Sequence, residues 1–300
     1  MSYGVVVPAY YGRAFIRRCL DSIFNQEEIT EPLSVIVIDD GPPRHESVEN
    51  LISDYPVQYY YRETNEGVFK TRLWGLDKLP QDVKYCAFLD QDDAWRPKFL
   101  TTLTSMLEER PELGFVACNV NVIESDKGLG AQHPLYDKRH PNLVLEDLKV
   151  ANQLISPSQV LMRRQALNDL HFGQDNLHLP YPGADDWLLW LSILSQGYQA
   201  SYTKSILVDY YDHEKGAHND VATMAQSEAY IVVHYFPLLH FSQWDQRLYR
   251  GRIGWDHIAE GVRTKNLGKL WEGLRILLKD PQALYQARLY RLRHKRQGII

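Results

Sequence analysis

Cys86-Ala-Phe-Leu-Asp-Gln-Asp-Asp93 brings three carboxylates together directly after a short apolar run. The apolar residues at 85–89 predict a buried strand that ends at these acids. Asp90, Asp92 and Asp93 repel one another at this spacing unless their charge is compensated. Mg²⁺ or Mn²⁺ would compensate it, because both ions prefer carboxylate oxygens and keep coordination positions for phosphates. The alternative is a polar turn in which one of the aspartates caps the following helix.

The chain before this stretch alternates between strand and helix patterns. Apolar, β-branched runs predict strands at 4–8, 33–38 and 57–61, and helical spacing predicts helices at 13–26, 47–54 and 68–79. This alternation predicts an α/β fold with a mostly parallel sheet flanked by helices. Ligands of such sheets bind beyond the carboxyl ends of the strands. The residues at 8–10, 39–40 and 90–93 all lie at strand ends, so we expect them to form one binding site.

The remainder of the chain divides into a second α/β part and a helical end. A helix is predicted at 98–110 and a strand at 114–123, and the composition then shifts to a loop at 124–142. Further strands are predicted at 156–162 and 198–208, and further helices at 164–170, 188–196 and over most of 221–296. We therefore expect one α/β domain with two halves, 1–123 and 124–215, and a C-terminal helical extension at 216–300.

Charge is distributed unevenly along the chain. Residues 246–300 carry 13 Lys and Arg against 4 Asp and Glu, a net charge of +9; because the whole chain carries −5, residues 1–245 carry −14. A basic tail in which leucine and aromatic residues are interleaved with arginines predicts a helix that lies on an anionic membrane. The alternative is a helix that packs on the acidic body. Nucleic acid is not expected as a partner, because no groove-reading motif accompanies the charge.

Cysteine usage and hydropathy indicate the compartment. Cys19, Cys86 and Cys118 lie in apolar surroundings at no metal-binding spacing, which predicts buried free thiols in a reducing compartment. The N-terminus enters a strand almost at once, so we expect no signal peptide. A membrane-spanning helix is not expected either, because no run of about 18 apolar residues is present. These features predict a cytoplasmic protein, with peripheral attachment to the inner face of the membrane if the tail binds lipid.

Five motifs, in order, resemble the inverting nucleotide-sugar glycosyltransferases of the GT-A fold, in particular the large family 2. They lie at 7–10 with 22–26, at 37–42, at 65–67 with 71–75, at 88–93, and at 185–190. The resemblance covers residues 3–215. It implies a GT-A, Rossmann-like sheet in which residues 1–123 bind the nucleotide sugar and residues 124–215 bind the acceptor and carry the catalytic acids.

The resemblance implies a donor site at the first strand ends. Asp40 would accept a hydrogen bond from the base, in a pocket that Pro8, Ala9 and Tyr10 complete. A turn-capping role is the alternative for Asp40. Arg72 would bind the base or the diphosphate through charge-assisted hydrogen bonds, and a surface ion pair is its alternative role.

The same resemblance assigns the metal to the acidic stretch, which corresponds to the family's DXD motif. Asp90 and Asp92 would bracket the ribose and the diphosphate, with Asp92 as the first ligand of Mn²⁺ or Mg²⁺. His213 follows the last predicted strand, where related enzymes often carry a histidine that reaches the metal or the diphosphate. Whether Asp93 also touches the metal stays open at this point.

Catalysis is implied at Asp185 and Asp186. Inversion requires a base that deprotonates the acceptor hydroxyl, and the resemblance gives that role to Asp186. Asp185 would contact the acceptor or the loop backbone, and the alternative is that one of the two acids caps the following helix. Tyr11, Leu73 and Asp185 replace the commoner Asn, Asn and Glu of the family, which leaves base and sugar specificity open.

These patterns together predict a metal-dependent hexosyltransferase. It would transfer a sugar from a nucleoside diphosphate, UDP first and dTDP second, to a saccharide or lipid-linked saccharide in bacterial surface-polysaccharide synthesis. A dinucleotide-dependent oxidoreductase is excluded, because the turn after the first strand lacks the G-x-G-x-x-G pattern. A non-catalytic sugar-binding protein on the same fold is the other alternative, although such a protein would be expected to lose some of these carboxylates.

Overall fold

The computed structural model describes residues 2–124, 131–136, 140–168, 179–212, 221–283 and 285. Its strands are β1 (Tyr3–Ala9), β2 (Leu33–Asp40), β3 (Gln58–Arg62), β4 (Tyr85–Phe88), β5 (Ala94–Trp95), β6 (Leu113–Glu124), β7 (Ala131–Pro134), β8 (Val160–Arg163) and β9 (Gln199–Asp212). Its α-helices are α1 (Ile16–Phe24), α2 (Val68–Lys78), α3 (Phe99–Glu109), α4 (Leu145–Leu148), α5 (Arg164–Asn168), α6 (Asp185–Ser195), α7 (Val221–Leu238), α8 (Gln243–Thr264) and α9 (Leu267–Lys279).

The described strands form one mixed sheet. Its order is β3-β2-β1-β4-β8-β6-β9-β5, and β7 pairs with β6. The strands from β3 to β4 are parallel, as the alternation of strands and helices predicts, and β6 is also parallel to β9. β8 is antiparallel to both neighbours, and β5 is antiparallel to β9. The parallel part therefore presents the carboxyl ends of β1, β2 and β4 at one edge.

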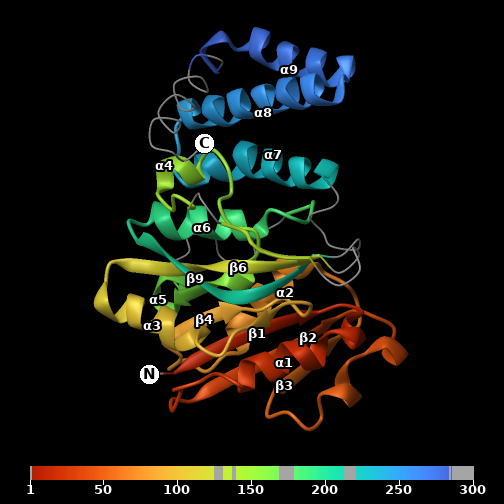
Figure 1. Cartoon of the computed structure of the whole chain (residues 1–300), viewed down its shortest axis with the longest axis vertical. Helices are drawn as coiled ribbons and strands as arrows, with labels where there is room; N and C mark the ends of the chain where they lie inside the picture. Colours follow the sequence, from red (N-terminus) through yellow and green to blue (C-terminus); the bar gives the residue numbers. More distant parts are fainter. Residues whose placement is uncertain are drawn as a thin grey trace.

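Helices cover both faces of this sheet (Figure 1). Because side chains alternate along a strand, Val5 and Val7 of β1 pack toward α1 and α3, whereas Val6 packs toward α2. α6 packs into the same hydrophobic core as Val6 and α2, and its residues 185–194 are all buried. Trp187 and Trp190, the largest side chains of α6, are fully buried. The first turn of α6 is thus held rigidly at the edge of the core.

One predicted helix, one predicted strand and one predicted loop differ from the structure. The strand expected at 156–162 begins only at Val160, because residues 157–159 form a 3-10 turn. The expected helix at 47–54 contains only a 3-10 turn, Glu49–Leu51. The Leu51 N–H donates to the Val48 carbonyl at 2.8 Å, an i to i−3 bond of a 3-10 turn in place of the α-helical i to i−4 bond. At the two ends of this turn, Arg17 donates to the Leu51 carbonyl at 2.7 Å and Asp39 accepts from the Val48 N–H at 2.8 Å. In the predicted loop at 124–142, residues 131–134 form β7 against β6.

The C-terminal part is helical through α9, as expected. α8 and α9 pack closely because glycines face the neighbouring backbone: a Cβ on Gly261 would lie 2.6 Å from the Leu270 nitrogen, and one on Gly273 would lie 2.5 Å from the Gly254 oxygen. None of the described helices is long and apolar enough to cross a membrane. The expected basic helix at the chain end falls mostly on residues 286–300, outside the described residues.

Candidate active site

The acidic stretch after β4 is tied directly to the end of β1. The Gln91 side chain accepts from the Tyr10 N–H at 3.0 Å and donates to the Tyr10 carbonyl at 2.9 Å. The Asp90 N–H donates to the Ser158 hydroxyl at 3.1 Å. These contacts bring the predicted base pocket and the predicted metal motif together. Pro8 and Ala9 are buried within β1, and the Tyr10 ring is 46% exposed beside them.

Arg72 joins three of the sequence motifs. Its guanidinium group, on α2, pairs with Asp90 after β4 and with Asp185 at the start of α6. Burial alone would lower the pKa of Arg72, but the carboxylates of Asp90 and Asp185 raise it above the ordinary value. Arg72 is only 6% exposed, so the alternative of a surface ion pair is wrong. The arginine is a buried bridge between the motif at 88–93 and the motif at 185–190.

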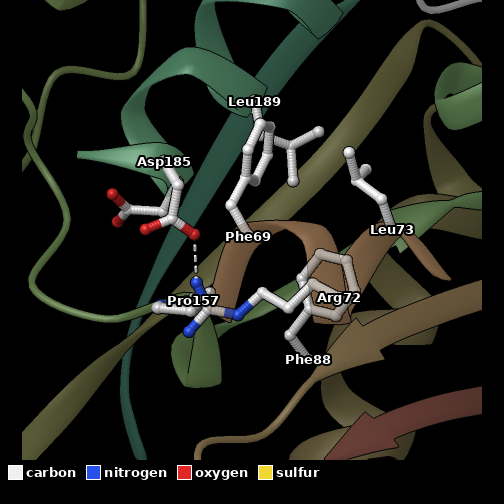
Figure 2. Close-up of a pocket in the computed structure, with 8 residues that line it drawn as sticks. Phe69, Arg72, Leu73, Phe88, Pro157, Asp185 and Leu189 are labelled. Atoms are coloured by element: carbon white, nitrogen blue, oxygen red, sulfur yellow. Dashed lines mark hydrogen bonds and ion pairs between the residues drawn. The ribbon is translucent and has the colours of Figure 1, made fainter. Parts of the chain in front are cut away.

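A pocket opens beside this bridge (Figure 2). Figure 2 shows Asp185 facing Arg72, with Phe69, Leu73 and Leu189 grouped on one side. The full lining is Phe69, Arg72, Leu73, Phe88, Pro157, Asp185, Asp186 and Leu189. The pocket is narrow, and it brings the carboxyl groups of Asp185 and Asp186 to the same side of Arg72 as the apolar residues.

Asp186 is a buried carboxyl group with a raised pKa. Its carboxylate accepts from the Asn152 amide at 3.1 and 3.2 Å and from the Trp187 N–H at 2.7 Å. Burial, together with the charge of Asp185, raises the pKa of Asp186 to about 7. Neither acid is the N-cap of α6, because Ala184 holds that position and no side chain caps the helix, although Asp186 accepts from the Trp187 N–H in the first turn of α6.

Asn152 is a site residue that the sequence patterns did not reveal. It lies in the segment between α4 and the 3-10 turn Pro157–Gln159, about thirty residues before α6. A lone asparagine in a loop has no periodicity or motif that marks it. Its role follows only from the tertiary contact with Asp186.

Asp93 is the buried member of the acidic stretch and is hydrogen-bonded to neighbouring segments. Its carboxyl group is 1% exposed, accepts from the Ser156 hydroxyl at 3.1 Å, and accepts from the Tyr211 N–H at 3.3 Å. Burial and then the charges of Asp92 and Asp90 raise the pKa of Asp93. The helix that follows starts without a side-chain cap, so the capping alternative is wrong here. Asp93 links the acidic turn to β9.

Asp90 and Asp92 supply the carboxylate oxygens that fit Mg²⁺ or Mn²⁺, with phosphates and water needed to complete the shell. The described residues contain no group of three or more His, Cys, Asp or Glu arranged to hold a metal ion. His213, the third predicted ligand, lies outside the described residues. Burial first, and then the charges of Asp92 and Asp90, raise the pKa of Asp93 at this turn.

Asp40 is engaged with the protein backbone. Its carboxylate accepts from the Gly67 N–H at 2.9 Å and from the Glu66 N–H at 3.2 Å, and burial raises its pKa. This is the turn-capping role given above as the alternative to base binding. Gly41, the next residue, has φ +76°, and a Cβ there would lie 2.3 Å from the Asn65 nitrogen. The end of β2 thus meets the 65–67 loop backbone to backbone.

The mixed sheet with an acidic edge and a buried carboxylate pair defines a glycosyltransferase of the GT-A fold. The family model described as glycosyl transferase family 2 matches residues 4–170. The chain belongs to this family.

Curated relatives agree with this assignment. An uncharacterized glycosyltransferase of Haemophilus influenzae is 27% identical over 215 residues, 68% of this chain and 63% of that protein. The succinoglycan biosynthesis protein ExoW of Rhizobium meliloti is 36% identical over 100 residues, 32% of this chain and 31% of that protein. The putative teichuronic acid biosynthesis glycosyltransferase TuaG of Bacillus subtilis is 22% identical over 69% of this chain and 77% of that protein. The chain spans less than two thirds of the first two relatives.

Solved structures share the fold. Staphylococcus aureus TarS 1-349 in complex with UDP-GlcNAc has a TM-score of 0.63 and 16% identity, covering 91% of this chain and 80% of that chain. The same TarS segment in complex with UDP has a TM-score of 0.53 and 17% identity, covering 99% and 92%. The likeness extends over the C-terminal helices as well as the sheet, because nearly the whole chain is covered.

Proposed function

We propose that this chain transfers a hexose from a nucleoside-diphosphate donor to a hydroxyl group of a saccharide or lipid-linked saccharide, with inversion at the anomeric carbon. The observation that carries the proposal is the cluster around Arg72. That residue joins Asp90, from the donor motif, to Asp185, from the catalytic motif, and Asp186 lies beside them in the same pocket. Donor and acceptor sites would therefore meet at this point.

The charge of the site favours a donor that arrives with a cation. Arg72 is already paired with two carboxylates, and Asp92 is a further acid in the same turn. A diphosphate would be repelled here unless Mn²⁺ or Mg²⁺ accompanied it. Asp92 and Asp90 would hold the metal, with His213 as a further candidate. When bound, the metal would neutralise the charge that develops on the leaving diphosphate.

UDP is the favoured nucleotide. The structural neighbour TarS was solved with UDP-GlcNAc and with UDP, which supports a uridine nucleotide for this chain also. The base would lie against Pro8, Ala9 and Tyr10, with Asp40 at its edge. Asp40 already accepts two backbone hydrogen bonds, so it would contact the base through its remaining lone pairs.

Asp186 would act as the base. It would take the proton of the acceptor hydroxyl while the acceptor oxygen bonds to the anomeric carbon and the bond from that carbon to the diphosphate breaks. A pKa of about 7 suits this role, because roughly half of the carboxyl groups are ionised at neutral pH and can accept a proton. A non-catalytic sugar-binding protein would have no need of a buried carboxyl group with this pKa, so we favour the enzyme.

The relatives named above support a role in polysaccharide biosynthesis, since one is named for succinoglycan and another for teichuronic acid. A cytoplasmic location belongs to the same proposal. Cys19, Cys86 and Cys118 are buried and unpaired, as expected in a reducing compartment.

Titration calorimetry with UDP, GDP and dTDP, each with and without Mn²⁺, tests the donor half of the proposal. UDP with Mn²⁺ should bind most tightly, and Asp92→Ala should weaken that binding. Lys98→Ala serves as a matched control, because Lys98 is exposed and forms only a long surface ion pair with Glu28 at 3.9 Å. Equal binding of the three nucleotides in the absence of metal would refute both the base pocket and the metal site.

A further inference from the structure

The outermost helix of the described chain presents an apolar stripe to solvent. α9 lies farthest from the sheet, and α8 separates it from α7 (Figure 1). Leu267, Trp271 and Leu278 on α9 are 81%, 69% and 71% exposed. At about 3.6 residues per turn, these three side chains fall within roughly 60° of the helix circumference. Large apolar side chains exposed together on one face mark a contact surface.

The opposite side of α9 packs against α8. Leu277 is 4% exposed and lies where Gly254 of α8 leaves room, and Gly273 faces the Gly254 carbonyl. The hairpin is therefore closed by its own contacts, and the stripe is not needed to hold α9 in place. Val262, near the end of α8 and five residues before Leu267, is a further exposed apolar side chain, at 64%.

Basic residues border the stripe. Arg275 and Lys279 are exposed, lie one helical turn apart, and follow the stripe along one side. Arg263 and Lys265 are exposed at the corner between α8 and α9. From 262 to 283 the sequence has five Lys and Arg against two acidic residues. The surroundings of the stripe therefore favour a negatively charged partner.

We propose that this α9 surface, made of Val262, Leu267, Trp271 and Leu278 with its basic border, docks on an anionic lipid bilayer. Leucine and tryptophan side chains enter the interface between headgroups and acyl chains, while neighbouring Lys and Arg bind the headgroup phosphates. Each basic residue near the surface adds to the binding, and salt weakens that contribution.

The size of the surface favours a bilayer over a second copy of the chain. α9 has 13 residues, so it is about 20 Å long and offers a face of roughly 200 Å². A stable dimer needs about 800 Å² per partner. A bilayer needs no complementary shape, and it can hold a narrow stripe of apolar groups. With a lipid-linked acceptor the docked surface would also bring the enzyme to its substrate, a consequence that rests on the proposed function.

Vesicle flotation of the full-length protein tests the proposal. The protein should float with vesicles of phosphatidylcholine and phosphatidylglycerol in low salt, and much less with phosphatidylcholine alone. Trp271→Glu combined with Leu278→Glu should lower binding by at least about tenfold, because two apolar side chains no longer enter the interface. Val233→Glu is the matched control, since Val233 on α7 is 54% exposed but lies off the surface, and it should float like the wild type.

Circular dichroism and sedimentation complete the test. All variants should keep the wild-type helix content, because the substituted side chains are exposed. The proposal is overturned if the wild type does not float with anionic vesicles, or if the double variant floats as well as the wild type. It is also overturned if the wild type is a dimer that the double variant disrupts without any vesicle binding. Nucleotide binding should be unchanged in the double variant, so a failure here is separate from a failure of the proposed transfer reaction.

Discussion

Asn152 donates its side-chain amide to both carboxylate oxygens of Asp186, at 3.1 and 3.2 Å. This contact stabilises the ionised form of a carboxyl group whose pKa burial otherwise raises. Asn152 thereby fixes the orientation of the acid and keeps part of its population ionised near neutral pH. It acts as a positioning residue, because its described contacts are with the carboxylate and the loop backbone.

Asn152→Leu should raise the pKa of Asp186 further and lower kcat at pH 7, with recovery at higher pH. The sign follows because loss of a hydrogen bond to the charged form favours the neutral form. A pH profile of kcat, measured together with the Kd for the donor, checks this: the acidic limb should move to higher pH and the Kd should stay unchanged. Asn142→Leu is the control, because Asn142 bonds to Asp147, outside the pocket. An unshifted profile for Asn152→Leu would show that the amide does not tune Asp186.

Arg72→Met should destabilise the fold as well as reduce donor binding. Removal of one partner from a buried ion pair leaves uncompensated charge, and the cost is about 3–5 kcal/mol. Urea unfolding at pH 7 should show this loss. Arg110→Met should cost much less, because its ion pair with Glu112 is exposed. Equal effects of the two substitutions would argue against a buried bridge.

Gly41→Ala should disrupt the contact between the end of β2 and the 65–67 loop. The added Cβ would meet the Asn65 backbone at 2.3 Å, and the φ of +76° is unfavourable for alanine. Gly67→Ala has a similar φ, +90°, but no atom within 4 Å of the added Cβ, so it should cost only about 1–2 kcal/mol. Denaturation of the two variants should therefore show the larger loss at Gly41. A larger loss of stability at Gly41 means that the close backbone contact matters at this turn, whereas equal losses mean that the positive φ alone accounts for both.

Asp39→Asn should become more stable relative to the wild type as the pH rises from 4 to 8. Burial raises the pKa of Asp39, so the unfolded chain ionises first and wild-type stability falls as pH rises toward the folded pKa. Asparagine keeps an acceptor for the Val48 N–H without a buried charge. Asp54→Asn should show the opposite trend, because Arg17 lowers the pKa of Asp54. Urea titrations of each variant and the wild type at several pH values check both trends. If the difference in unfolding free energy between Asp39→Asn and the wild type does not change with pH, the raised pKa of Asp39 is contradicted.

Local patterns predicted the elements that build the site. Alternating strands and helices predicted the parallel half of the sheet, and the motifs pointed to Arg72, Asp90 and Asp185, which the structure brings into contact. These predictions succeed because each motif sits at a strand end or a helix start, where topology dictates the neighbours.

Tertiary contacts account for what the patterns missed. The 47–54 segment has a helical pattern, but only a 3-10 turn forms, and side chains of α1 and β2 bind the Leu51 carbonyl and the Val48 N–H at its ends. Asn152 and Ser158 join the site from an irregular segment. Asp40 lies in a family motif, yet its carboxylate oxygens accept hydrogen bonds from the backbone N–H groups of Glu66 and Gly67. None of these partners could be inferred from sequence spacing.

The central claim is that Asp186 is the catalytic base, and one comparison tests it most directly. Steady-state turnover and donor Kd should be measured side by side for the wild type, Asp186→Asn and Asp185→Asn at pH 7 with Mn²⁺. For Asp186→Asn we expect the donor Kd to stay near the wild-type value and kcat to fall by about 100-fold or more, because the positioned base is lost. If Asp186→Asn turns over at the wild-type rate, the base lies elsewhere and the account of this site is wrong.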